Sequence, residues 1–168
     1  IRVVPVPGAC AAIAALSAAG LPSDRFVFEG FPPAKSAARR AVFEKLREES
    51  RTLIFYESPH RILESLKDMS GVFGPGREAV LARELTKQFE TLHAGGLQEL
   101  LEWVGHDADQ QLGEFVILIH GVPRAELHAA ALLGRGVVPL PLDQARPLQR
   151  LDLRPRAVVL DRGALLAH

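Results

Sequence analysis

The sequence predicts an α/β fold for residues 1–121, because short apolar segments with strand composition alternate with segments of helical periodicity. The clearest pair is the strand predicted at residues 51–57 and the helix after it, whose apolar stripe consists of Ile62, Leu63, Leu66 and Met69. The continuous apolar centre of that strand is typical of a sheet covered on both faces. We therefore expect a central sheet with flanking helices.

Three earlier elements fit this alternation. Residues 1–7 have the composition of a strand that enters a loop, and residues 9–19 predict a small-residue helix that ends at Gly20. This helix is apolar on every side, so we expect it to be buried between layers. Residues 25–31 have strand composition, and the Pro32-Pro33 pair ends that strand.

A basic helix is predicted next, from about residue 34 to residue 49. Its inward stripe consists of Val42, Phe43 and Leu46, which leaves Arg39, Arg40 and Lys45 mostly outside.

Beyond the strand at residues 51–57, Ser58 is expected to cap a helix that has Pro59 at its first position. A loop is predicted at residues 71–76, a strand at residues 79–83 and a final strand at residues 114–120. The apolar residues Leu97, Leu100, Leu101 and Val104 mark the last helix of the domain. Residues 122–168 lose this periodicity, and we treat them as a divergent tail with one helix expected around residues 125–133.

The composition restricts the class of protein. Twenty Lys and Arg balance 20 Asp and Glu, so nucleic-acid binding would require a local patch. The single cysteine excludes an internal disulfide framework, and no Cys/His spacing indicates a metal site, which favours a reducing, cytoplasmic setting. The longest apolar run, residues 9–19, is too short to span a bilayer, so no membrane association is expected.

Five separated blocks carry a resemblance to one family. They are residues 3–13, 20–26, 29–35, 55–61 and 82–87, and Gly113-Glu114 precedes the last predicted strand. In order and in spacing these blocks resemble the ribosomal RNA small subunit methyltransferase I family, a branch of the tetrapyrrole methylase superfamily. The resemblance covers residues 1–121.

The resemblance implies a mixed sheet with flanking helices, corresponding to the C-terminal domain of a two-domain enzyme that binds S-adenosyl-L-methionine between its domains. It implies 2′-O-methylation of a cytidine ribose in 16S ribosomal RNA, with the small ribosomal subunit as partner and a homodimer as the assembly. The family's glycine-rich cofactor loops would precede residue 1. We therefore expect the isolated chain to lack half of the cofactor site and to be inactive.

Methyl transfer from a sulfonium depends mostly on positioning and desolvation, although a group that removes or reorients the proton of the ribose hydroxyl would help. The candidates for that role are Glu57, His60, Glu84, Lys87 and Glu90. The polar stretch from Arg83 to Glu90 could equally be a salt-bridged surface, so no base is assigned.

The predicted cofactor-binding residues are Gly8, Cys10, Ala11, Tyr56 and Glu57. Small residues before a helix permit close approach, and a helix N-terminus offers free N–H groups. Tyr56 and Glu57 end a strand, where open α/β sheets bind ligands. Without the resemblance, a tightly packed turn is the simpler interpretation, with Cys10 as a small buried residue.

A positive surface formed by Lys35, Arg39, Arg40, His60 and Arg61 could engage RNA phosphates, although such a helix face is as often merely solvated. Two other functions stay open. One is a methyltransferase of the same superfamily that acts on a tetrapyrrole or another small substrate, and the other is a non-catalytic domain that binds RNA or dimerises.

Overall fold

The computed structural model describes residues 2–123. The elements follow in the order α1 (Ala11–Ala18), β1 (Phe26–Gly30), α2 (Ser36–Lys45), β2 (Thr52–Glu57), α3 (Ile62–Phe73), β3 (Glu78–Arg83), β4 (Thr91–Gly96), α4 (Leu97–His106), the short helix η1 (Ala108–Gln111) and β5 (Phe115–Ile119). None of the helices in this part of the chain combines the length and the hydropathy that a membrane span requires.

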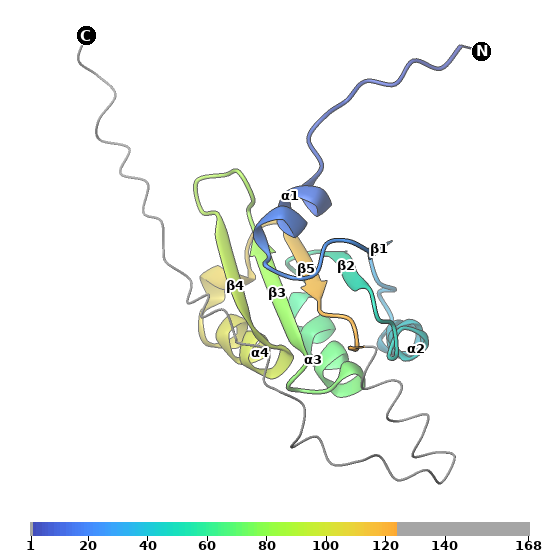
Figure 1. The fold of residues 1–168 in the computed structure, drawn as a ribbon. Helices are drawn as coiled ribbons and strands as arrows, with labels where there is room; N and C mark the ends of the chain where they lie inside the picture. Colours follow the sequence, from blue (N-terminus) through green and yellow to red (C-terminus); the bar gives the residue numbers. More distant parts are fainter. Residues whose placement is uncertain (1, 124–168) are drawn as a thin grey trace, which may run out of the picture.

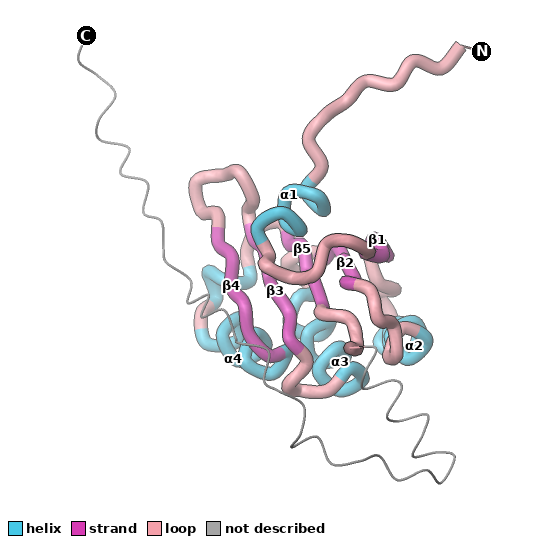
Figure 2. Tube along the Cα trace, in the orientation of Figure 1, coloured by secondary structure: helices cyan, strands magenta, loops and turns pink. Residues whose placement is uncertain are grey.

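The strands form one mixed sheet in the order β1-β2-β5-β3-β4. Strands β1 and β2 are parallel, whereas β5 is antiparallel to both β2 and β3, and β4 is antiparallel to β3. The C-terminal ends of β1, β2 and β3 therefore meet the N-terminal ends of β5 and β4 at one edge of the sheet. The loop between β3 and β4 lies at the same end of the sheet as α1 (Figure 2).

Helices cover both faces of the sheet, as the sequence predicts, but they cover them unequally (Figure 1). Helices α2, α3 and α4 pack on one face, where Phe43, Leu66 and Leu100 belong to the larger core. On the other face α1 is the only described helix that packs against side chains such as Ile54 and Val116. Alternate residues of β2 and β5 point to opposite faces, so each strand contributes to both cores.

Two expectations for the N-terminal region are wrong. Residues 2–10 form no strand and are exposed, because Pro5 and Pro7 lack backbone donors and no described strand pairs with this segment. Helix α1 is not buried on every side either. Its residues Ala12, Ala15 and Leu16 face the sheet, whereas Ile13 is 49% exposed because the helix contacts only one layer.

The connection between β2 and α3 also differs from the prediction. Ser58 is not the cap of α3, since residues 58–61 form a turn in which the Arg61 N–H donates to the Ser58 carbonyl at 3.1 Å. The helix begins at Ile62 and continues to Phe73, which shortens the predicted loop at residues 71–76. Strand β4 was not predicted, because a segment with one His and two glycines has little strand propensity.

The residues expected in the divergent tail, including the helix at residues 125–133, lie outside the described range.

Candidate functional site

Most of the predicted site residues lie along the edge where β1, β2 and β3 end. In the register of the sheet, Glu57 and Arg83 lie on either side of Phe115, the first residue of β5. Thr91 at the start of β4 pairs with Arg83. The carboxyl ends of strands are where α/β sheets usually bind ligands. Two pockets occur at this edge, one at the end of β2 and one at the end of β3.

The first pocket has a volume of about 430 Å³ and lies between the end of β2 and the first turn of α1. Its walls include Ala11, Phe31, Tyr56 and Glu114. The rings of Phe31 and Tyr56 are 5.6 Å apart, and Phe31 is 61% exposed. The pocket therefore presents an aromatic wall to solvent.

Tyr56 connects this pocket to α1. Its hydroxyl accepts a hydrogen bond from the Ala12 N–H at 3.1 Å, which satisfies one of the free donors at the helix N-terminus. Burial raises the pKa of Tyr56, so the hydroxyl stays neutral. Cys10, expected to be buried, is instead exposed, and the Ile13 N–H lowers the pKa of its thiol.

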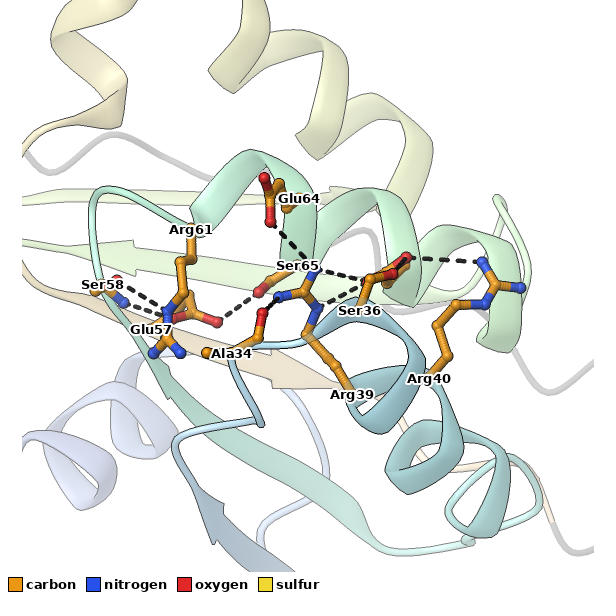
Figure 3. A network of polar contacts seen from close by, with 10 residues as sticks. Ala34, Ser36, Arg39, Arg40, Glu57, Ser58, Arg61, Glu64 and Ser65 are labelled. Carbon is orange, nitrogen blue, oxygen red and sulfur yellow. Dashed lines mark hydrogen bonds and ion pairs between the residues drawn. The ribbon is translucent and has the colours of Figure 1, made fainter.

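The Glu57 carboxylate is buried, and each of its oxygens has a partner (Figure 3). Oε1 accepts from the Ser58 N–H at 2.7 Å and pairs with Arg61 Nη2 at 2.9 Å. Ser65 Oγ donates to Oε2. Glu57 thus fixes the turn at residues 58–61, which forms part of the first pocket, and both of its oxygens are engaged within the protein.

Arg39 does not lie on the predicted basic surface. It is 1% exposed, because its guanidinium pairs with Asp68 on α3, with Nε 2.7 Å from Oδ2. Ala34 O accepts from Nη1 at 3.2 Å, and Ser36 Oγ donates to Asp68 at 2.9 Å (Figure 3). The outward position predicted for Arg39 is therefore wrong: a buried guanidinium needs a partner, and this one joins α2 to α3 instead of facing RNA.

The other predicted RNA-binding residues do reach the surface. Lys35, Arg40 and His60 are exposed, and the Arg61 side chain is 26% exposed. Arg40 also approaches Asp68, with its Nη1 3.7 Å from Oδ1. These four residues stay a prediction for phosphate binding.

A second polar cluster, formed by Glu84, Lys87 and Glu114, lies at the end of β3. Lys87 Nζ is 3.0 Å from Glu84 Oε1 and 3.0 Å from Glu114 Oε2. The Glu114 N–H donates to Glu84 Oε1 at 2.9 Å and lowers the pKa of Glu84. The hydrogen bond to Glu84 raises the pKa of Lys87, which keeps it an ammonium group that donates and does not accept protons.

The loop that carries this cluster has an unusual backbone. Glu84 and Thr86 have φ values of 50° and 66°, in the left-handed region that residues with a side chain rarely adopt. Glu90, another predicted catalytic residue, supports this loop by accepting from the Thr86 N–H at 2.6 Å. Facing Glu84, Gly113 has a φ of 98°, and a Cβ at this position would lie 2.5 Å from Glu84 Cγ. Only glycine leaves room for Glu84 here.

The second pocket has a volume of about 270 Å³ and lies beside the cluster. Arg83, Glu84, Phe89 and Leu112 are among its lining residues. Because Lys87 bonds to Glu84 of this pocket and to Glu114 of the first pocket, the cluster stands between the two.

The structure thus brings Ala11, Tyr56 and Glu57 together at the first pocket, with Glu84 and Lys87 nearby. Gly8 does not join them, since it lies in the exposed segment before α1, and a Cβ there would meet nothing within 4 Å.

Sequence reasoning did not single out several residues that line the pockets, among them Phe31, Phe89 and Glu114. Phe31 directly follows β1 and Glu114 directly precedes β5, and these positions at strand termini are the signal that could have identified them. Phe89 carries no such signal, because it lies within the loop between β3 and β4.

A comparison with known families matches residues 1–101 to the family described as tetrapyrrole (corrin/porphyrin) methylases. The chain is 58% identical over 154 residues to the ribosomal RNA small subunit methyltransferase I of Pseudomonas aeruginosa, covering 88% of this chain and 55% of that protein. It is 52% identical over 155 residues to the protein of the same name from Escherichia coli O157:H7, covering 88% of this chain and 53% of the relative. The chain therefore spans about half the length of these curated relatives.

Two solved structures share the fold. The methyltransferase CobJ superposes with a TM-score of 0.52 at 19% identity, covering 69% of this chain and 49% of that one. The cobalt precorrin-4 methyltransferase CbiF superposes with a TM-score of 0.51 at 14% identity, covering 68% and 50%. At such identities the likeness concerns the fold alone, but the family match extends over more than half of the sequence. The chain therefore belongs to the tetrapyrrole methylase family.

Proposed function

We propose that this chain is part of an S-adenosyl-L-methionine-dependent methyltransferase that modifies the 2′-hydroxyl of a cytidine in 16S ribosomal RNA. The proposal rests on the sequence identity of the chain, 58% and 52%, to two relatives named ribosomal RNA small subunit methyltransferase I. Since the chain spans about half of their length, we expect the activity of a protein that contains the remaining part as well, and not of the isolated chain.

The first pocket fits one end of the proposed cofactor. Its volume of about 430 Å³ lies in the lower part of the range of about 300–1,000 Å³ that small-molecule sites usually measure. The aromatic wall of Phe31 and Tyr56 matches a flat adenine ring, and the methyl side chain of Ala11 leaves space beside the helix N-terminus. Glu57 supports the turn that completes this wall.

S-adenosyl-L-methionine would supply a methyl group on a positively charged sulfur. Glu114 lines the pocket with a side chain that is 83% exposed, and its carboxylate favours a cation at this edge of the sheet. The chemistry supplied there would be transfer of that methyl group from sulfur to the ribose oxygen, with loss of the hydroxyl proton to water.

Lys87 is the residue that we assign to positioning the ribose. Its ammonium is held by two carboxylates between the two pockets, and its side chain is still 45% exposed. A hydrogen bond from Nζ to the 2′-oxygen would direct an oxygen lone pair toward the methyl group. Such orientation contributes much of the rate of reactions that need little acid-base catalysis.

The exposed basic residues Lys35, Arg40, His60 and Arg61 are proposed to contact phosphates of the small ribosomal subunit, which would position the RNA without selecting a sequence. A homodimer is proposed as the functional assembly, as the resemblance implies.

The test is a methyl-transfer assay with labelled S-adenosyl-L-methionine and small ribosomal subunits that lack the modification. Two proteins are compared, the chain alone and the chain joined to the part of the Pseudomonas aeruginosa relative that it does not cover. We expect label at a cytidine ribose with the joined protein only. A joined protein that folds and binds the cofactor, yet labels no ribosomal RNA, would overturn the proposal in favour of a small substrate.

A further inference from the structure

The second pocket combines groups that recognise a nucleobase. Its volume of about 270 Å³ is small enough for one flat ring system and too small for a whole dinucleotide-sized ligand. Phe89, at 64% exposure, and Leu112, at 60%, give it apolar sides that face solvent. Proteins that bind unpaired RNA bases commonly stack them on such exposed aromatic rings.

Two polar side chains of this pocket, Glu84 and Arg83, are an acceptor and a donor. Glu84 uses only Oε1 for its bonds to Lys87 Nζ and the Glu114 N–H, so among the described residues Oε2 has no hydrogen-bond partner. Arg83 is 8% exposed and donates through Nη1 to the carbonyls of Asp109 and Leu112, at 2.9 and 3.2 Å. Its Nε is also buried and unpaired within residues 2–123, so the guanidinium keeps a donor that no described residue uses.

We propose that this pocket binds an unpaired base that carries an amino group, and that Glu84 is the residue that selects it. The amino group of cytosine or adenine donates to Glu84 Oε2, and the acceptor beside it on the same edge faces Arg83. Uracil presents a carbonyl oxygen where the amino group would lie, so its oxygen would face a carboxylate oxygen. This inference rests on the proposed function, because it assumes that the substrate is RNA.

The charges around the pocket agree with a site for a base and not for a phosphate. Glu84, Glu90, Asp109 and Glu114 lie on or beside it, against the cations of Arg83 and Lys87. This excess of negative charge repels phosphate groups. The base therefore enters alone, while phosphates are held on another surface.

The test is a titration of the isotope-labelled 168-residue chain with cytidine, adenosine and uridine, followed by amide resonances in NMR spectra. We expect cytidine and adenosine to shift the amides of Phe89, Leu112 and Gly113, with an affinity at least about fivefold higher than that of uridine. Equal binding of all three nucleosides, or shifts confined to other residues, would overturn the inference.

Two variants make the test specific. In Glu84→Gln, the two donors at Oε1 hold the amide oxygen, so the amide NH₂ faces the pocket and the preference should reverse toward uridine. Phe89→Ala should lower the affinity for all three nucleosides by about tenfold without changing the order of their affinities. Glu44→Gln on α2 removes the same charge from an exposed side chain away from the pocket and serves as the matched control.

The spectra of both variants also report whether the fold is intact, so loss of binding in an unfolded protein is recognised. A Glu84→Gln protein that is folded and keeps the preference of the natural chain would contradict the role of Glu84. The nucleoside titration is independent of methyl transfer. If the chain binds nucleosides selectively but the joined protein transfers no methyl group, the proposed function is rejected and the proposed base-binding role of the second pocket is retained. If the joined protein transfers methyl groups but the chain binds nucleosides without selectivity, only the role of the second pocket is rejected.

Discussion

The ion pair between Arg39 and Asp68 and the ion pair between Lys87 and Glu84 have similar lengths, at 2.7 and 3.0 Å, but lie in opposite environments. The first is buried between α2 and α3, with side-chain exposures of 1% and 9%. The second lies at the edge of the sheet, with exposures of 45% and 18%. Burial decides what each pair can do: the first joins two helices, and the second is accessible to a ligand.

The energetic consequences follow from desolvation. Removing one member of a buried pair leaves an unpaired charge in a medium of low polarity, whereas an exposed pair gains little because water solvates either partner alone. The Arg39–Asp68 pair should therefore matter for stability, and the Lys87–Glu84 pair for activity. Four predictions test this difference.

The largest effect is expected for Asp68→Ala. Arg39 would lose its main partner while it stays buried, and the free energy of unfolding should fall by about 3–5 kcal/mol. Urea unfolding measures this value. Asp68→Asn is the control. Its amide oxygen can still accept hydrogen bonds from Arg39 and Ser36, so the free energy of unfolding should fall by less than in Asp68→Ala. A loss below about 1 kcal/mol for Asp68→Ala would mean that the pair behaves like an exposed one.

Gly113→Ala should have the next largest effect. The φ of 98° strains any side chain, and the new Cβ would displace Glu84, so we expect a loss of about 1–3 kcal/mol together with a shifted Glu84. Gly76→Ala is the matched control, because a Cβ there meets nothing within 4 Å and its φ is not positive. Equal unfolding midpoints for the two variants would show that the loop at Gly113 relaxes without cost.

The pair of Arg39 and Asp68 also shows what the sequence could and could not predict. Apolar periodicity predicted most of the helices and strands, since β2 and α3 each bury a continuous stripe. The same periodicity placed Arg39 outside, because a helical stripe records hydrophobicity and cannot identify a distant carboxylate such as Asp68. Pairing between residues 29 positions apart is a property of the tertiary structure.

The residues of the candidate site could likewise be predicted only in part. The sequence singles out Tyr56 and Glu57 because strand ends bind ligands, and Glu84 and Lys87 because the local sequence is densely charged. The structure places these residues at or beside the two pockets, and their roles stay predictions. The contact between Gly113 and Glu84 could not be found, since it depends on two backbone conformations with positive φ values. The loop that contains Phe89 was not recognised either, because the strand that ends it, β4, was not predicted.

Lys87→Met should separate activity from stability. The methionine keeps much of the side-chain length but removes the ammonium, so methyl transfer by the joined protein should fall by about 10- to 100-fold. The free energy of unfolding should change by less than about 0.5 kcal/mol, because the lost pair is exposed. Lys67→Met on the exposed side of α3 is the control for loss of one charge. Unchanged transfer in Lys87→Met would remove Lys87 from the site.

The smallest effect concerns a second exposed ion pair, Glu49–Arg51. The hydrogen bonds from the Arg51 side chain lower the pKa of Glu49 from 4.5 to about 2. Because the folded-state pKa is the lower one, the stabilisation is complete above pH 4.5 and is lost as the pH falls toward 2. Arg51 is 46% exposed, so the contribution should not exceed about 1 kcal/mol.

Urea unfolding of the natural chain and of Glu49→Gln between pH 6 and pH 2 measures this contribution. The two proteins should differ in free energy of unfolding at pH 6 and converge as the carboxylate is protonated. Glu48→Gln, which changes the neighbouring exposed residue, should show no such convergence. A difference that stayed constant down to pH 2 would mean that Glu49 acts through packing. In that case geometry as well as burial would determine what an ion pair near the surface of this domain contributes.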